Sequence, residues 1–355
     1  MTRDSRCLSH RGNVERPGGE VDRPAGDIEH PRARFEHRPV MLHEVVELLA
    51  PCPPGVIIDA TVGAGGHAAA LLSESPRHRL IGLDRDPEAL EAAESTLRPF
   101  GARSALLHAR FDRLGEIAAD LAPGLPVSGV LFDLGVSSWQ LDDPGRGFSY
   151  RFDAPLDMRM DRGDRLTATD VVNTWEAREL ARIFAANGEN RFALLIARAI
   201  VRNRPITSTG KLSEVVRAAI PASARRRGGH PAKRVFQALR VIVNEELELL
   251  RPALDAAIDL LVPTGRVVVI SYHSGEDRLV KEHFAAAASG WCTCPPGLPC
   301  ACGAVPLVRL LNRGARMATT GEREANRRAQ SARLRAAERL DAKPRRTGAP
   351  RGEET

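Results

Sequence analysis

An acid ends each of three short apolar runs in the first half of the chain, and a glycine-rich turn follows the first run. Asp59 ends "GVIID" and leads into "ATVGAGGHA", Asp84 ends "RLIGLD", and Asp133 ends "GVLFD". Glycines after a strand let backbone N–H groups approach a ligand, and a carboxylate on the next strand can accept hydrogen bonds from ribose hydroxyls. The pattern therefore predicts an adenosine-containing ligand at one edge of a parallel sheet.

The glycine turn by itself is compatible with several kinds of ligand. Gly63-Ala64-Gly65-Gly66-His67-Ala68 satisfies the dinucleotide pattern, and Asp84 follows it by about 20 residues, which suits the ribose of NAD and of S-adenosylmethionine equally. A Walker-type phosphate loop is disfavoured because no Gly-Lys-Ser/Thr follows. The order Asp59-x-Thr61-x-Gly63 and the further acid Asp133 favour S-adenosylmethionine; a turn that only closes a strand–helix connection is the remaining alternative.

The elements that must position these acids alternate between short apolar runs and helical stretches. "GVIIDA", "RLIGLD", "SALLHA" and "GVLFDLG" predict four strands of a parallel sheet built from βαβ units. The next strand, "GRVVVISY", comes roughly 130 residues later, although such connections are normally one helix and short loops. We therefore predict a doubly wound α/β sheet with a helical insertion after strand four, and two further strands in "PLVRLLN" and "SARLRAAERL".

The same patterns divide the chain into segments. Residues 1–35 lack apolar periodicity and are predicted as a disordered leader, and 341–355 as a loose tail. The sheet domain takes 36–140 and 232–340, and the helical insertion takes 141–231. One amphipathic helix from Ala232 to Leu250 is expected to pack on the sheet, with an opposite face made of Lys233, Gln237, Arg240, Asn244 and Glu248.

Composition limits the kinds of protein that this chain can be. Of 355 residues 43% are hydrophobic, 27% charged and only 4% aromatic, which indicates a globular protein without an extended base-stacking platform. No stretch reaches the roughly 18 apolar residues of a membrane span, and the N-terminus lacks the apolar core of a secretory signal. We therefore expect a cytoplasmic protein without a membrane partner.

Several segments together resemble the ribosomal RNA small subunit methyltransferase H family (RsmH, also called MraW), which methylates the exocyclic N4 of a decoding-centre cytidine in 16S rRNA. The similarity runs from about His37 to Lys281, and its most specific part is "FDLGVSSWQLDDPGRGFSYRFDAPLDMRMD". It implies an α/β, doubly wound, Rossmann-like class I S-adenosylmethionine-dependent methyltransferase with a helical insertion domain after strand four. The cofactor would be S-adenosylmethionine, and the substrate 16S rRNA within a 30S subunit or its precursor.

The resemblance also assigns roles to individual positions. The residues that would bind S-adenosylmethionine are Gly65, Gly66 and His67 at its methionine part, Asp84 at its ribose, Phe111 near its adenine, and Asp133 and Gln140, which complete the pocket. Without the resemblance, Phe111 would be interpreted as a core residue and Gln140 as a surface amide.

The segment from Pro221 to Arg240 holds six basic residues and no acid. Such a patch suits a polyanion because each neutralised phosphate releases counterions, although a solvated surface explains it equally well. The insertion would recognise the RNA, and contacts are assigned to Arg225, Arg226, Arg227, Lys233 and Arg234.

The chemistry of the cytosine amino group points to an acceptor at the end of strand four. The amino lone pair is delocalised into the ring, so a group that accepts the amino protons would assist attack on the methyl group. DNA amino methyltransferases often carry Asp/Asn/Ser-Pro-Pro-aromatic at this place, whereas this chain has "DLGVSS". A backbone carbonyl or the serine hydroxyls of this loop would act on a flipped-out base. The catalytic candidates are Asp133, Ser137 and Ser138, followed by Asp157, Asp161 and His273, although Asp157 and Asp161 could equally bridge Arg159 and Arg162.

Four of the six cysteines lie together in "CTCPPGLPCACG", as Cys292, Cys294, Cys300 and Cys302. Two Cys-x-Cys pairs could make a tetrahedral sulfur site for zinc, but known zinc modules more often use Cys-x2-Cys, and methyl transfer requires no metal. Thiols or a reversible disulfide are the alternative. The sequence leaves the oligomeric state open, with a homodimer as one option.

Overall fold

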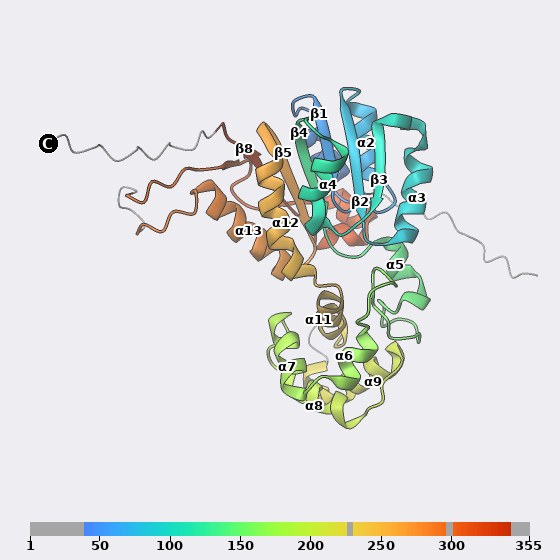
Figure 1. Cartoon of the computed structure of the whole chain (residues 1–355). Coiled ribbons are helices and arrows are strands. Elements are labelled where there is room, and N and C mark those ends of the chain that lie inside the picture. The colour runs from blue at the N-terminus through green and yellow to red at the C-terminus, as the bar shows by residue number, and fades with distance from the viewer. Residues whose placement is uncertain (1–38, 226–229, 296–300, 342–355) are drawn as a thin grey trace, which may run out of the picture. The chain divides into compact units, whose positions relative to one another are not determined.

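The computed structural model describes residues 39–225, 230–295 and 301–341, so the predicted leader and nearly all of the predicted tail lie outside the described residues. The strands are β1 Gly55–Asp59, β2 His78–Asp84, β3 Ser104–His108, β4 Val127–Asp133, β5 Leu261–Ser271, β6 Val308–Leu310, β7 Arg316–Met317 and β8 Arg333–Arg339. They form one sheet in the order β3-β2-β1-β4-β5-β8-β6, with β7 paired to β8 (Figure 1). The pairs from β3 to β5 are parallel, and β8 pairs antiparallel with β5, β6 and β7. The five predicted parallel strands and the two added ones are confirmed; β7 was not predicted.

The middle strands of the sheet are buried on both faces. Every residue of β4 except Asp133 is buried, and so is every residue of β1 except Gly55. A parallel sheet covered on both faces requires continuous apolar runs, which is the pattern that the sequence shows. Because these strands are parallel, Asp59, Asp84 and Asp133 end at the same edge of the sheet.

Helices cover both faces of the sheet. On one face, α1 (Leu42–Leu49) and α2 (Gly66–Glu74) share a hydrophobic cluster with Ile57 of β1, and α3 (Pro87–Leu97) packs on α2 and β2. On the other face, α4 (Leu114–Leu121), α12 (Glu246–Leu260) and α13 (Ser274–Ala288) share a cluster with Ile58. Successive strand residues point to opposite faces, so this packing is that of a doubly wound sheet. No helix in the described ranges is long and apolar enough to cross a membrane.

The connection from β4 to β5 is helical, as predicted, and has a hydrophobic core of its own. Buried side chains from the insertion's helices pack there with Phe148 and Met158. This core also takes in Val235, Phe236 and Leu239, which the sequence analysis assigned to the sheet domain. The packing of the insertion therefore continues to about Val243. Its helices are α5 Ser138–Asp142, α6 Ala168–Thr174, α7 Ala177–Ala186, α8 Ala193–Arg202, α9 Thr209–Ala219, α10 Ala222–Arg225 and α11 Lys233–Val243, and α14 Thr320–Ala325 follows near the C-terminal end.

The single helix predicted from Ala232 to Leu250 is wrong, because the chain breaks between α11 and α12. Glu245 adopts the left-handed conformation with φ of 52°, and only α12, after the break, packs on the sheet. Asn244 was expected on the solvent face but is fully buried. Its side-chain amide donates to the carbonyl oxygens of Met158 and Arg240 (both 2.8 Å) and accepts from the N–H of Met160 (2.8 Å). These long-range bonds explain why the helix stops there.

Candidate active site

The turn after β1 needs glycine at two positions for backbone reasons. Gly63 and Gly65 have φ of +52° and +83°, a region that side chains rarely adopt. A Cβ on Gly63 would meet only the Thr61 carbonyl oxygen, at 4.0 Å, so open space borders the turn. Gly66 is required for a different reason, because a Cβ there would lie 2.4 Å from Cγ of Pro39. The turn therefore presents exposed backbone beside an open volume.

Asp84 closes this turn from the end of β2. One carboxylate oxygen accepts the N–H of Gly63 and the other the N–H of Asp86, each at 2.9 Å. Burial raises the pKa of Asp84 to about 6, partly offset by these two hydrogen bonds. Each oxygen keeps lone-pair capacity, so the carboxylate can also accept from a vicinal diol.

Asp133 lies across the turn at the end of β4 and is held from three directions. Its backbone N–H donates to the Thr61 hydroxyl (2.6 Å), and its Oδ1 accepts from the Tyr272 hydroxyl (2.7 Å). Its Oδ2 lies 3.6 Å from Nδ1 of His67. Burial and the charge of Asp133 raise the pKa of Tyr272 well above its usual value, so the phenol remains a donor. The carboxylate is thus fixed in direction.

His67, at the start of α2, is buried between the turn and the segment before α1. Its Nε2 lies 3.0 Å from the Val40 carbonyl oxygen, which can only accept, so Nε2 carries the proton. Nδ1 then faces Asp133. Contact of His67 with the methionine part of the cofactor remains a prediction.

Asp59 is fully buried at the base of the same turn. Burial raises its pKa to about 8, and the nearby Asp133 and Asp84 add to the shift, while the Thr61 N–H opposes it. Three acids therefore share this edge, and the most deeply buried one is mainly protonated at neutral pH.

Gln140 and Ser137 form a capping box at the start of α5. The Gln140 N–H donates to the Ser137 hydroxyl (3.2 Å), and the Gln140 side-chain oxygen accepts from the Ser137 N–H (3.0 Å). The amide nitrogen of Gln140 donates to Asp86 (2.7 Å), which also receives the buried guanidinium of Arg146 (2.7 Å). Gln140 is 4% exposed, so it is not the surface amide that its type alone suggests. The side chain of Ser138 lies outside what the structure describes.

Phe111 follows β3 and is half-buried. Its ring lies edge-on to Phe132, with ring centroids 6.0 Å apart, and packs against the core on that face. This contact is the core role considered for Phe111, and the adenine contact remains a prediction.

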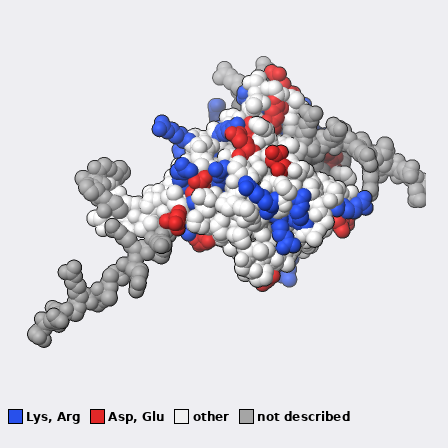
Figure 2. Space-filling model, turned by 90° about the horizontal axis from the view of Figure 1, so that it is seen from above, with Lys and Arg blue, Asp and Glu red and all other residues white. Residues whose placement is uncertain are grey.

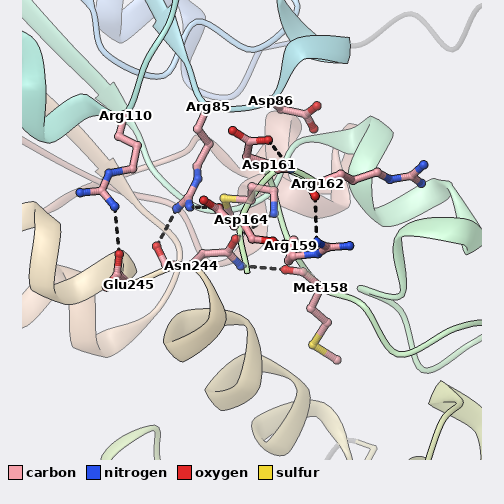
Figure 3. A network of polar contacts seen from close by, with 12 residues as sticks. Arg85, Asp86, Arg110, Met158, Arg159, Asp161, Arg162, Asp164, Asn244 and Glu245 are labelled. Atoms are coloured by element: carbon pink, nitrogen blue, oxygen red, sulfur yellow. Dashed lines mark hydrogen bonds and ion pairs between the residues drawn. The ribbon is translucent and has the colours of Figure 1, made fainter. Parts of the chain in front are cut away.

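Of the three second-rank candidates, Asp161 lies at the junction between the insertion and the sheet (Figure 3). Asp157 holds the Arg159 guanidinium at 2.7 Å; burial raises its pKa, but the hydrogen bonds and charge of Arg159 outweigh burial and lower it. Asp161 pairs with His108 at 3.0 Å rather than with Arg162. His273 caps α13, because its Nδ1 accepts the N–H groups of Gly275 and Glu276. All three therefore have structural partners.

Arg85, which directly follows Asp84, carries the central contacts of this junction. One of its terminal nitrogens donates to the Asn244 carbonyl oxygen and the other to the Asp164 carboxylate, each at 2.6 Å. Arg110 makes a more exposed pair with Glu245 at 3.0 Å. Figure 3 shows these side chains reaching from the sheet edge to the insertion loop and to the break between α11 and α12.

The structure describes only part of the expected RNA contacts. Lys233 and Arg234 are exposed at the start of α11, and Arg234 lies 3.5 Å from Glu189. The side chain of Arg225, and Arg226 and Arg227 entirely, lie outside the described residues. On the face shown in Figure 2, basic and acidic side chains are interspersed.

Sequence reasoning missed several residues that organise this edge. Tyr272 directly follows β5, so its position after a buried strand could have placed it beside Asp133. Asp86 and Arg146 form a buried ion pair that no spacing revealed. The full set is Asp86, Arg146, Asn244 and Tyr272.

A doubly wound sheet with acids at the ends of β1, β2 and β4 around a glycine turn is a Rossmann-like arrangement, which the class I methyltransferase fold shares. Residues 34–340 match the MraW methylase family, and the chain belongs to that family. Methylases of this fold use S-adenosylmethionine, which is therefore the cofactor.

Individual relatives agree with this assignment. The chain is 52% identical over 307 residues to ribosomal RNA small subunit methyltransferase H of Heliobacterium modesticaldum, covering 85% of this chain and 98% of that protein. It is 54% identical over 313 residues to the protein of the same name from Thermobifida fusca, covering 85% and 92%. A solved structure of a putative rRNA-methylase from Clostridium thermocellum aligns over 86% of this chain and all of that chain, with 15% identity and a TM-score of 0.40.

Proposed function

We propose that this chain methylates the exocyclic N4 of a decoding-centre cytidine in 16S rRNA, using S-adenosylmethionine. The observation that carries the proposal is 52–54% identity, over nearly the whole of each relative, to proteins named ribosomal RNA small subunit methyltransferase H. The proposed substrate is the cytoplasmic 30S subunit or its precursor, and a homodimer is the proposed assembly.

The residues at the sheet edge fit the cofactor. The open space beside Gly63 leaves room for a ligand against the backbone, and Asp84 retains lone pairs for ribose hydroxyls. When bound there, S-adenosylmethionine supplies an electrophilic methyl group. In this proposal Gly65, Gly66 and His67 border its methionine part and Phe111 its adenine.

Asp133 is the acceptor that the geometry supports best for the cytosine amino protons. Its carboxylate accepts the Tyr272 hydroxyl, and because a carboxylate can accept several hydrogen bonds at once, a substrate amino group can be a further donor. That bond would localise the nitrogen lone pair toward the methyl carbon. Ser137 ranks below Asp133 because its hydroxyl already caps α5, and Ser138 is retained as a candidate.

We propose that the insertion binds the RNA and that the target base leaves its stack to reach this edge. The supporting observation is the direct attachment of the insertion to the ends of β2 and β3 through Arg85 and His108. Lys233, Arg234 and the basic residues before them are the proposed phosphate contacts. Their replacement should weaken RNA binding and flatten its salt dependence while cofactor affinity is retained.

The deciding experiment is mass spectrometry of 16S rRNA from cells with and without the gene. We expect the methyl group on the decoding-centre cytidine to disappear in the deletion strain and to return with the wild-type gene. Asp133→Ala should not restore it, while Ser137→Ala and Ser138→Ala test the lower-ranked acceptors. Equal methylation in both strains would refute the proposed function, and tritiated methyl transfer to 30S subunits against free rRNA identifies the substrate form.

A further inference from the structure

Three cysteines gather in the loop between α13 and β6, away from the groups used for methyl transfer. Cys292, Cys294 and Cys302 place their sulfur atoms within 4.8 Å of one another. The N–H of Ala301 donates to the Cys294 sulfur at 3.3 Å. A backbone N–H directed at sulfur stabilises a thiolate, which is the form that binds metal.

The separation of the sulfur atoms is too long for a disulfide and is compatible with a shared metal ion. Sγ of Cys292 and Sγ of Cys302 lie 3.6 Å apart. A disulfide requires about 2.05 Å. Zinc–sulfur bonds of about 2.3 Å in a tetrahedron place neighbouring sulfur atoms about 3.8 Å apart, close to the observed value.

The loop that carries these cysteines is closed at its base but has little core of its own. The Leu307 N–H donates to the Ala287 carbonyl oxygen (2.9 Å), and the Trp291 N–H to that of Ala286 (2.8 Å). Gly290 approaches the Val305 backbone so closely that a Cβ would lie 2.3 Å from its carbonyl oxygen. Among the described residues, none of 291–295 and 301–304 is buried, so apolar packing does not hold these two segments together. A cross-link between the two segments would have to do so.

We propose that Cys292, Cys294 and Cys302 bind one zinc ion, which fixes this loop as a structural site. Clustered thiolates select soft or borderline metals, and tetrahedral sulfur sites are typical of zinc. The catalytic edge lies at the start of α13, and this loop follows its end, about 22 Å away along a 15-residue helix. The ion therefore serves the fold of the loop rather than methyl transfer.

A second group of potential ligands, Glu246, His273 and Glu276, is better explained without metal. His273 uses Nδ1 to cap α13, which leaves the proton on Nε2, facing Glu276 at 3.2 Å. The Arg240 guanidinium already binds both oxygens of Glu246. A cation would have to displace these partners.

Metal analysis of the full chain, purified without a tag under reducing conditions, tests the proposal. We expect about one zinc per chain by elemental mass spectrometry, and replacement by Co²⁺ should give the visible absorption of a tetrahedral thiolate complex. Single Cys→Ser changes at 292, 294 and 302 should each lower bound zinc at least about tenfold, whereas Cys52→Ala, a buried cysteine elsewhere, should retain it. Cys300 lies outside the described residues. Cys300→Ser is measured in the same way, to find out whether Cys300 is the fourth ligand.

Hydrogen exchange provides a readout that does not depend on enzyme activity. Adding zinc to metal-free protein should slow exchange in peptides spanning 289–307, including the Ala301 amide, and should leave the Gly63 turn unchanged. Zinc that survives all three serine substitutions, an iron–sulfur cluster in place of zinc, or a loss of two mass units indicating a disulfide would each overturn the proposal.

Discussion

At the scale of single residues, the Tyr272 hydroxyl is one of the groups that direct the Asp133 carboxylate. Tyr272→Phe removes the donor at 2.7 Å but keeps the ring that packs beside Gly135. We expect methyl transfer to slow by about 10- to 100-fold, the cost of one hydrogen bond to a charged group, while S-adenosylmethionine affinity stays within about threefold. Single-turnover methylation and calorimetry measure the two quantities.

A control measurement on Tyr272→Phe distinguishes an effect on the position of the Asp133 carboxylate from an effect on the stability of the protein. The thermal midpoint of Tyr272→Phe should stay close to that of the wild type, so that a slower single-turnover rate reports the position of the Asp133 carboxylate and not a loss of fold. An unchanged single-turnover rate would show that Tyr272 has no part in positioning the acceptor.

A second residue-scale effect concerns Asp84 and pH. Its pKa is raised to about 6, so the carboxylate is charged above that pH and protonated below it. Ribose hydroxyls donate to the charged form, so S-adenosylmethionine affinity should fall by up to about tenfold per pH unit below pH 6 and level off above pH 7. Titration calorimetry from pH 5 to 8 measures this. Asp84→Asn should bind more weakly with little pH dependence, and a wild-type affinity that stays constant down to pH 5 would contradict the assignment.

At the scale of elements, the break between α11 and α12 rests on Asn244. Asn244→Ala would leave the Met158 carbonyl and the Met160 N–H without their partner in a buried site. We expect the free energy of unfolding to fall by about 2–4 kcal/mol, measured by urea denaturation. Glu248→Ala, an exposed change on α12, should alter it by less than about 0.5 kcal/mol. If both variants change the free energy of unfolding equally, Asn244 does not stabilise the break between α11 and α12.

The same break shows what the sequence could and could not predict. The strands were predictable because burial on both faces demands apolar runs, and the three acids because parallel strands end at one edge. The end of α11 at Asn244 could not be predicted, because the apolar spacing continues past this residue. The hydrogen bonds that end the helix join Asn244 to residues more than 80 positions away in the sequence. Tyr272 was missed although its place directly after β5 puts it beside Asp133 at the end of the neighbouring strand β4.

At the scale of the whole molecule, side-chain contacts join the insertion to the sheet edge at which Asp59, Asp84 and Asp133 lie. These contacts add to the covalent connections of the backbone. Arg85 follows the acid Asp84 directly and binds both Asp164 of the insertion loop and the carbonyl oxygen of Asn244. Arg85 is 9% exposed, and a largely buried charged hydrogen bond contributes more than an exposed pair. This arrangement attaches the insertion to the sheet edge that carries Asp84.

Arg85→Met tests that attachment with a side chain of similar length and no charge. Removing Arg85 leaves the Asn244 carbonyl oxygen and the Asp164 carboxylate, whose side chain is 34% exposed, without this donor, so residues 141–243 should exchange backbone hydrogen faster. Methylation of 30S subunits should fall at least about tenfold, with S-adenosylmethionine affinity within about threefold. Arg110→Met is the control: its pair with Glu245 is 39% and 56% exposed and should contribute little to holding the insertion, and its other partner, Asp112, lies only two residues away in the same segment. If both variants behave alike, the insertion is held by its apolar packing and not by Arg85.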